Sequence, residues 1–111
     1  MGRKPTDVLQ GTLTLLILKT LAARGALHGY GIATHLLEAS EEALRIEEGS
    51  LYPALHRMEE QGWIKAAWGM SELGRRARFY TITAAGRRQL ASEEARWAGI
   101  TAAVNRVLRY V

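Results

Sequence analysis

The sequence predicts a mainly α-helical fold with a small β-hairpin, and three observations carry this prediction. Apolar residues recur at helical spacing over residues 8–61. The spacing changes to strand-like alternation over residues 63–82, and a seven-residue repeat then runs to the end of the chain. A chain of 111 residues, with 48% hydrophobic and 23% charged residues, has the size and composition of one soluble globular domain.

Two helices and a minimal strand are predicted in the first part of the chain. The first helix presents an apolar face over residues 8–21 and ends at Arg24-Gly25, where glycine supplies a left-handed cap conformation. The second helix is predicted over about residues 29–39, and the alternation in Leu44-Arg45-Ile46 predicts a very short strand after it. Four apolar residues form the inward face of the second helix: Ile32, Ala33, Leu36 and Leu37.

A third helix is predicted over about residues 50–61, where Gly62 ends it. Proline is tolerated in the first turn of a helix, so Pro53 places the start near residues 49–50, with Ser50 or Glu48 as the cap. Its buried stripe is formed by apolar residues at i, i+4 and i+7: Leu51, Leu55 and Met58.

A β-hairpin follows the third helix. Residues 63–69 alternate, and so do residues 78–82, with a loop predicted from Met70 to Ala77 between them. Thr83 is the expected cap of a final helix with Gly86 in its first turn. The side chains expected to share the inner face of the hairpin are Ile64, Ala66, Trp68, Tyr80 and Ile82.

The final helix carries a seven-residue apolar repeat that extends to Val111 and is interrupted by Glu93. Such a seam usually packs on a partner helix, often from a second copy of the chain, although the helix could instead fold back on its own domain. We therefore predict one compact unit with residues 1–82 as the nucleic-acid-binding domain and residues 83–111 as a dimerisation helix. The expected dimer contacts are Leu90, Trp97, Ile100, Val104, Val107 and Leu108.

Three helices followed by a hairpin with a basic loop is the element order of a winged helix-turn-helix. In that fold the third helix enters the major groove of DNA and the hairpin, or wing, contacts the backbone or the minor groove. The face of the third helix opposite its buried stripe offers Ser50, Tyr52, Pro53, His56, Arg57 and Glu60. The wing offers Arg75, Arg76 and Arg78 as phosphate contacts.

Charge is unevenly distributed along the chain, whose net charge is +4. Residues 63–88 hold six cationic side chains against one glutamate, whereas residues 31–62 hold seven glutamates against two arginines. Glu59 and Glu60 must turn away from DNA if the third helix reads it, because a carboxylate repels phosphate. The acidic stretch and the apolar Leu73 favour the alternative of a winged helix used as a protein-interaction module without a DNA operator.

Several linked motifs, in the right order over about residues 7–108, resemble the PadR family of bacterial transcriptional regulators. The likeness is carried by Gly11-Thr12-Leu13, Leu15-Leu16-Ile17-Leu18, Leu27-His28-Gly29-Tyr30-Gly31-Ile32, Gly49-Ser50-Leu51-Tyr52-Pro53-Ala54-Leu55-His56-Arg57-Met58-Glu59, Trp68-Gly69, Gly74-Arg75-Arg76, Tyr80 and Thr83-Ala84-Ala85-Gly86. Because the chain has one helix after the wing, it is similar to the short-form members of that family.

The resemblance implies a homodimeric repressor that binds double-stranded DNA through its third helix and wing. It places Tyr30, Ser50, Tyr52, His56 and Arg57 at the DNA surface, with Arg75, Arg76 and Arg78 as wing contacts. Trp97 resembles the tryptophan that lines a dimer cavity for planar aromatic effectors in some short-form members. Its spacing alone favours a residue that fills the helix–helix contact, and both roles are compatible if the dimer leaves a gap there.

Other classes of function find no support in the sequence. There is no cysteine, and the three histidines (His28, His35 and His56) form no ligand pair at helical spacing, so we expect no metal and no cofactor. His28 is expected to cap or pack near the second helix instead. No catalytic constellation, secretory signal or membrane-length apolar run is present, which predicts a cytoplasmic protein that is not an enzyme and has no membrane partner.

Overall fold

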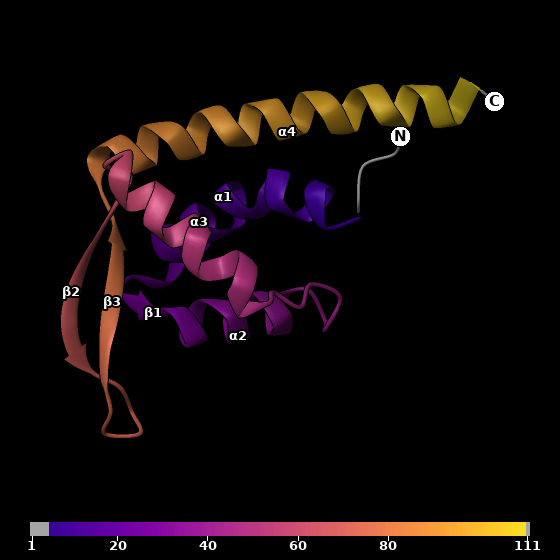
Figure 1. Cartoon of the computed structure of the whole chain (residues 1–111). Helices are drawn as coiled ribbons and strands as arrows, with labels where there is room; N and C mark the ends of the chain where they lie inside the picture. The colour runs from indigo at the N-terminus through magenta and orange to yellow at the C-terminus, as the bar shows by residue number, and fades with distance from the viewer. Residues whose placement is uncertain (1–4, 111) are drawn as a thin grey trace.

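The computed structural model describes residues 5–110, with side chains from residue 11 onwards (Figure 1). The predicted fold class is confirmed: four helices accompany a small antiparallel sheet in a winged-helix arrangement. Val111, at the end of the predicted repeat, lies outside the described residues. The elements are α1 (Pro5–Arg24), β1 (Leu27–His28), α2 (Gly29–Ala39), α3 (Glu48–Glu60), β2 (Ile64–Met70), β3 (Arg76–Ile82) and α4 (Ala84–Tyr110).

The junction between α1 and α2 follows the predicted capping. Gly25 adopts a φ of +81° and donates its amide to the Leu21 carbonyl at 3.0 Å, which ends α1. His28 is the N-cap of α2, and its Nδ1 accepts a hydrogen bond from the Gly31 amide at 2.9 Å. The expectation that His28 caps this helix is therefore confirmed.

The third strand of the sheet is β1, which sequence analysis missed. Leu27 pairs with Tyr80 and His28 with Phe79, so β1 lies along the edge of β3 that faces away from β2. The strand predicted at residues 44–46 is wrong: this segment is irregular, and Ile46 instead fills the core at 9% exposure. Two residues are too few to show alternation, and a single β-branched residue in a loop can imitate it.

The predicted start of α3 was two residues late. The helix begins at Glu48, after the N-cap Glu47, whose side chain makes no capping hydrogen bond, so neither Ser50 nor Glu48 is the cap. Pro53 lies beyond the first turn and cannot donate to the Gly49 carbonyl four residues earlier. Both Pro53 and Gly49 are exposed, so water can solvate that carbonyl at little cost.

The hairpin is longer than predicted and its loop is shorter. β2 and β3 pair from Ile64 with Ile82 out to Met70 with Arg76, which leaves residues 71–75 as the loop. Trp68 shares the face of the hairpin with Ala66 and Tyr80, as predicted, because it pairs with Arg78 on β3. It is nevertheless 61% exposed, because the outer half of the hairpin extends past the helices (Figure 1). Its ring instead carries the Arg76 guanidinium, at 5.0 Å from the ring centroid.

The core lies where the helices meet the inner half of the sheet. The predicted stripe of α3 is confirmed, since Leu51, Leu55 and Met58 are all at most 2% exposed. Leu90 of α4 is also buried in this core. The sequence predicted it as a dimer contact, but its side chain already packs inside its own domain. Beyond Leu90, α4 runs alongside α1, where Glu94 pairs with Lys19 at 3.2 Å. Its C-terminal end then extends past the other helices, and the molecule measures 54 Å in its longest dimension. Within the described part of the chain, none of the helices is long and apolar enough to span a membrane.

We predict that Gly86→Ala destabilises the fold, because α4 crosses the base of the hairpin without room for a side chain. An alanine Cβ would collide with the Trp63 carbonyl oxygen and lie 2.8 Å from Cγ1 of Ile82. Overpacking against a backbone atom should lower the free energy of unfolding by about 1–3 kcal/mol, measured by urea denaturation.

Gly11→Ala is the matched control, since Gly11 lies in α1 with no heavy atom within 4 Å of the added Cβ. This variant should be neutral or more stable by up to about 1 kcal/mol, because alanine is the better helix former. A loss of stability of equal size in both variants would contradict the packing argument.

Candidate nucleic-acid interface

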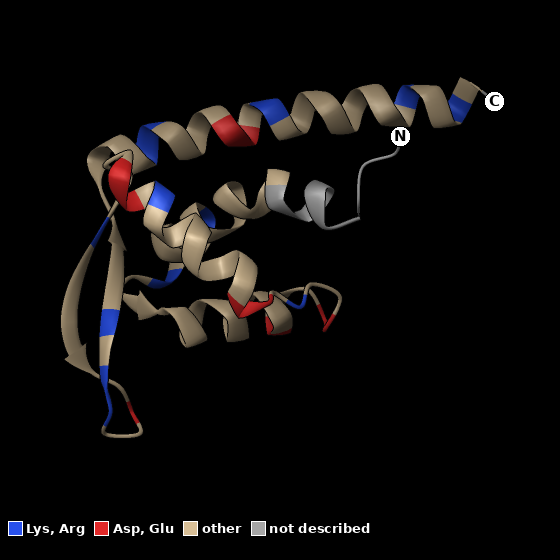
Figure 2. Cartoon of the chain, in the orientation of Figure 1, with Lys and Arg blue, Asp and Glu red and all other residues tan. Residues whose placement is uncertain are grey.

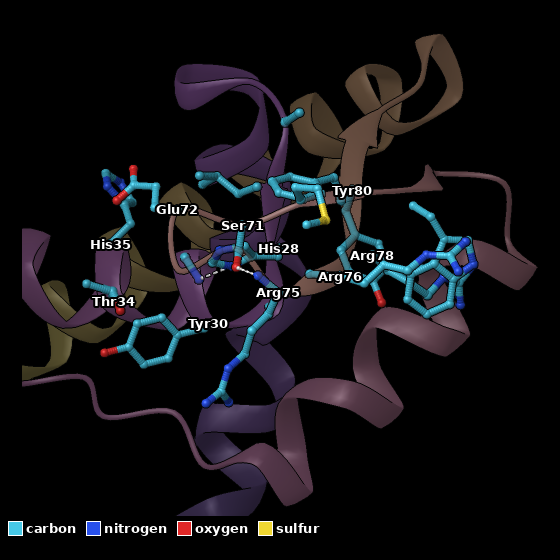
Figure 3. A pocket seen from close by; sticks show the side chains of 18 of the residues that line it. His28, Tyr30, Thr34, His35, Ser71, Glu72, Arg75, Arg76, Arg78 and Tyr80 are labelled. Carbon is cyan, nitrogen blue, oxygen red and sulfur yellow. Dashed lines mark hydrogen bonds between the residues drawn. The ribbon is translucent and has the colours of Figure 1, made fainter.

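A broad, open hollow of about 1210 Å³ separates the hairpin from the helices (Figure 3). Its walls are the end of α1, the first turns of α2, one face of α3 and the outer part of the hairpin. Three helices and the hairpin therefore face one concave surface.

The structure brings six of the eight predicted residues around this hollow. Its lining includes Tyr30, Tyr52, His56, Arg75, Arg76 and Arg78. Ser50 and Arg57 do not line it, although both lie on α3. Tyr52 and His56 are four residues apart and share the face toward the hairpin, whereas Ser50 and Arg57 are seven apart and share a neighbouring face. Arg57 is exposed there and Ser50 is half-buried.

Tyr52 has a packing role as well as an exposed edge. Its ring covers Gly29 at the start of α2 so closely that a Cβ at that position would lie 2.6 Å from the Tyr52 hydroxyl oxygen. The ring is still 46% exposed. Glycine at position 29 thus allows α3 to approach α2, which sets the angle of the helix-turn-helix.

Aromatic rings form one wall of the hollow. The His28 ring lies 5.2 Å from that of Phe79 and 6.3 Å from that of Tyr30, so the α2 cap is joined to β3 through its ring as well as its backbone. Tyr30 at the end of this series is 74% exposed. Its exposure leaves the ring free to contact a partner.

Two residues of the hollow were missed by sequence reasoning. Arg24, in the last turn of α1, lines the hollow and adds a fourth arginine to it. Trp68 lies on the inner face of the hairpin, as predicted, and it lines the hollow under the Arg76 guanidinium. Neither position carries a local signal, because each reaches this surface only through the tertiary arrangement.

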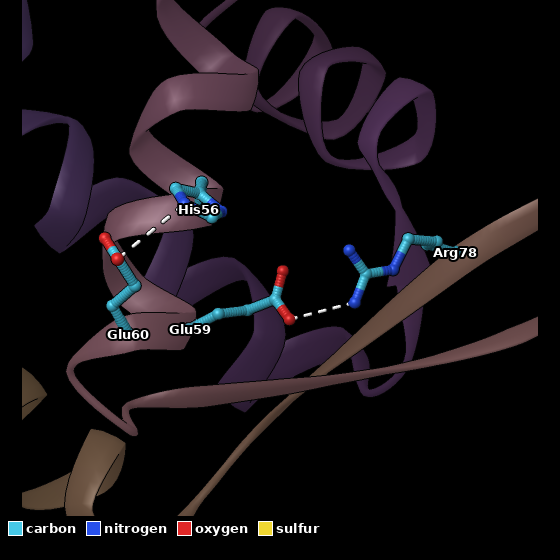
Figure 4. Close-up of polar contacts among 4 residues, drawn as sticks. All are labelled: His56, Glu59, Glu60 and Arg78. Atoms are coloured by element: carbon cyan, nitrogen blue, oxygen red, sulfur yellow. Dashed lines mark hydrogen bonds and ion pairs between the residues drawn. The ribbon is translucent and has the colours of Figure 1, made fainter.

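The two acidic residues at the end of α3 have different partners (Figure 4). Glu59 accepts a hydrogen bond from Nη2 of Arg78 at 2.9 Å, so its charge is balanced by the wing. Oε2 of Glu60 lies 3.8 Å from Nε2 of His56 on the exposed side of the helix, an ion pair whenever the imidazole is protonated. The sequence required both glutamates to turn away from DNA. Glu59 does not have to, because Arg78 balances its charge, whereas Glu60 stays exposed.

The distribution of charge on the fold separates a basic hairpin from acidic helix ends. Figure 2 shows arginines along β3 and its loop, and glutamates at both ends of α3. Of the wing arginines, Arg75 and Arg76 have exposed side chains that make none of the described ion pairs. Arg78 does make one, with Glu59, and its predicted role as a wing contact stays a prediction.

Tyr80 lies at the base of the hollow, 5% exposed, with the Arg78 guanidinium 5.9 Å from its ring centroid. Burial raises the pKa of the Tyr80 phenol above its usual value. The positive charge of Arg78 lowers this pKa, whereas Glu59 and Tyr52 raise it further. The net effect is an upward shift.

No group of three or more metal-ligating side chains occurs among the residues that the structure describes. The charged and aromatic groups around the hollow instead suit a polyanion with planar rings, since guanidinium groups bind phosphate and aromatic edges pack on sugars and bases.

The three helices, the hairpin and the edge strand together define a winged helix-turn-helix protein. Residues 17–92 match the transcriptional regulator PadR-like family, and the chain belongs to that family. The resemblance seen in the sequence is confirmed. The expectation that the chain is not an enzyme agrees with this membership, because the family consists of transcriptional regulators.

Solved structures support the same assignment. A transcriptional regulator from Clostridium thermocellum is 30% identical, with a TM-score of 0.82 over 90% of this chain and 96% of that one. A PadR-like transcriptional regulator from Bacillus cereus is 30% identical, with a TM-score of 0.77 over 92% of this chain and 96% of that one. A relative found by sequence, an uncharacterized protein of Lysinibacillus sphaericus, is 26% identical over 95 residues, which is 86% of each chain.

We predict that stability declines at alkaline pH through Tyr80. The pKa of its phenol is higher in the folded chain than in the unfolded one, because burial disfavours the phenolate. The folded chain is therefore more stable with a neutral phenol than with an ionised one. That contribution is complete below the unfolded pKa of about 10 and is lost as pH rises through the higher folded pKa. Urea denaturation of Tyr80→Phe should show a shallower decline above this pH than the parent chain.

Tyr30→Phe is the control, because it removes a phenol that is 74% exposed. It should follow the pH dependence of the parent chain. Identical alkaline slopes for the parent and Tyr80→Phe would show that Tyr80 does not carry the effect.

Proposed function

We propose that the chain is a homodimeric, sequence-specific regulator that binds double-stranded DNA and represses transcription in the cytoplasm. The observation that carries this proposal is the hollow itself, where wing arginines and the exposed face of α3 border one surface. Family membership supports a role in transcription. The repressor role rests on the resemblance of the sequence to the PadR family.

In this proposal, α3 reads the DNA sequence and the wing binds the DNA backbone. Hydroxyl, imidazole and guanidinium groups on α3 and at the start of α2 would contact base edges and nearby phosphates. These groups belong to Tyr30, Ser50, Tyr52, His56 and Arg57. Arg75 and Arg76 would neutralise phosphates without sequence preference, since they are exposed at the outer end of the hairpin.

The far half of α4 supports dimerisation. Its apolar repeat is left exposed by the side chains that the structure describes, and an exposed apolar stripe of this length is typical of a helix that packs on a partner. The exposed fractions are 47% for Trp97, 50% for Ile100, 50% for Val104, 65% for Val107 and 66% for Leu108. Residues 83–111 are therefore our proposed dimerisation segment, with Leu90 assigned to the core instead.

The planar aromatic effector implied by the resemblance would lie between two copies of α4, beside Trp97. The small side chains near it leave space for such a molecule: Ala98, Gly99 and Ala103. Trp97 is half exposed in the single chain, so it can serve either to fill the helix contact or to stack on a ligand. This effector stays a prediction.

We predict that Arg75→Ala with Arg76→Ala weakens binding to every duplex rather than to one sequence. Each arginine that neutralises a phosphate releases counterions, so the slope of log K against log salt should become shallower by about 1.8 for the pair. Fluorescence anisotropy of labelled duplexes over a salt series measures this slope.

The control is Arg88→Ala, which removes an exposed charge of α4 that does not line the hollow. Its salt slope should equal that of the parent chain. If the parent chain binds no duplex even at low salt, the DNA-binding proposal fails, and the protein-interaction module is the function that remains.

We predict that Ile100→Glu with Val104→Glu converts the dimer into a monomer, because two carboxylates would have to be buried in the helix contact. Sedimentation velocity should show the halved mass, and binding to palindromic duplexes should weaken as avidity is lost.

Ala102→Glu is the matched control for this change. Ala102 is two residues from both Ile100 and Val104, so it lies on the opposite side of α4 and is exposed. It should leave the dimer intact. A parent chain that sediments as a monomer at micromolar concentration would contradict the dimer proposal directly.

A further inference from the structure

An ion pair between Glu59 and Arg78 connects the helices to the wing. It joins the last turn of α3 to the middle of β3, across 19 residues of sequence. Arg78 lies one residue beyond the last β1–β3 pair, His28 with Phe79. Among the described ion pairs, this is the one that joins α3 to the hairpin.

Arg78 is held from two sides, unlike its neighbours on the wing. Its guanidinium donates to the Glu59 carboxylate and lies 5.9 Å from the centroid of the buried Tyr80 ring. The Glu59 side chain is only 23% exposed, so water screens the pair less than it would screen a pair on the open surface. Arg75 and Arg76 have no such carboxylate partner among the described ion pairs.

We infer that Arg78 is a positioning residue that fixes the wing relative to α3, and that Glu59 withholds its positive charge from the DNA backbone. The inference rests on the proposed DNA-binding function and refines it. The base of the hairpin is anchored in the core through Ile64 and Tyr80, whereas its outer half contains exposed residues such as Trp68. A tie at Arg78 therefore controls the distance between the two surfaces that contact DNA.

This role predicts a pattern of salt slopes that a phosphate contact cannot produce. Glu59→Gln removes the carboxylate and frees the guanidinium, so the salt slope on a random-sequence duplex of about three helical turns should steepen by about 0.9. Glu59→Gln with Arg78→Met is neutral at both positions and should keep the parent slope. If Arg78 already contacts phosphate, the single variant would keep the slope and the double variant would lose about 0.9.

The positioning role of Arg78 is tested by how well the protein discriminates between duplexes. Discrimination between the best duplex selected from a randomised pool and the random-sequence duplex should fall about threefold or more in the neutral double variant, because α3 and the wing lose their fixed separation. The reversed pair, Glu59→Arg with Arg78→Glu, should recover much of this discrimination. A reversed pair no better than the neutral one would overturn the positioning role.

Amide hydrogen exchange of the free protein separates this inference from the proposed function. Exchange in the outer half of the hairpin should rise in the neutral double variant and return toward the parent level in the reversed pair. If the parent chain binds no duplex, the DNA-binding proposal fails and with it the claim about withheld charge, while the exchange result still decides whether the pair holds the wing. Unchanged exchange in all variants would overturn that role.

Discussion

The turn from the hairpin into α4 is the constraint on which the other surfaces depend. The Thr83 hydroxyl donates to the Gly62 carbonyl at 2.6 Å and accepts from the Gly86 amide at 3.0 Å, while the Thr83 amide donates to the Trp63 carbonyl at 3.0 Å. One residue thus joins the end of α3, the hairpin and the start of α4. Because Gly86 lacks a side chain, α4 packs directly on the Trp63 backbone and the three elements have one relative orientation.

Sequence periodicity was sufficient for the helices and the hairpin because their signals are local. The stripe of Leu51, Leu55 and Met58, the glycine cap and the Thr83 cap were each visible in a few consecutive residues. The edge strand β1 was not, since its two residues pair with a strand about fifty positions later. Leu90 belonged to the repeat of α4 by spacing, and only the packing of the first turns of α4 on the domain assigns it to the core.

The candidate site was predictable in its residue types but not in its pairings. Sequence placed Arg75, Arg76 and Arg78 together as equivalent cations, and it placed Glu59 as a source of repulsion. The structure makes Arg78 and Glu59 partners, so one cation and one anion cancel at the inner part of the hollow. The two wing arginines without a described carboxylate partner, Arg75 and Arg76, lie at the outer end of the hairpin. Such a pairing depends on the angle between α3 and β3, which no local pattern encodes.

In the proposed dimer, the angle between α3 and β3 sets how each chain presents its DNA-binding surface. α4 has 27 residues, which makes it about 40 Å long, and its unsatisfied apolar face lies in the half farthest from the domain. In a two-fold assembly through that face, each α4 would act as a rigid lever between the symmetry axis and one DNA-binding surface. A small rotation at the helix contact would then move α3 and the wing together, because the Thr83 turn and the Glu59–Arg78 pair hold them as one body. Since half-sites on DNA have a fixed helical spacing, a molecule bound between the two helices could change operator affinity without touching the DNA-binding surface.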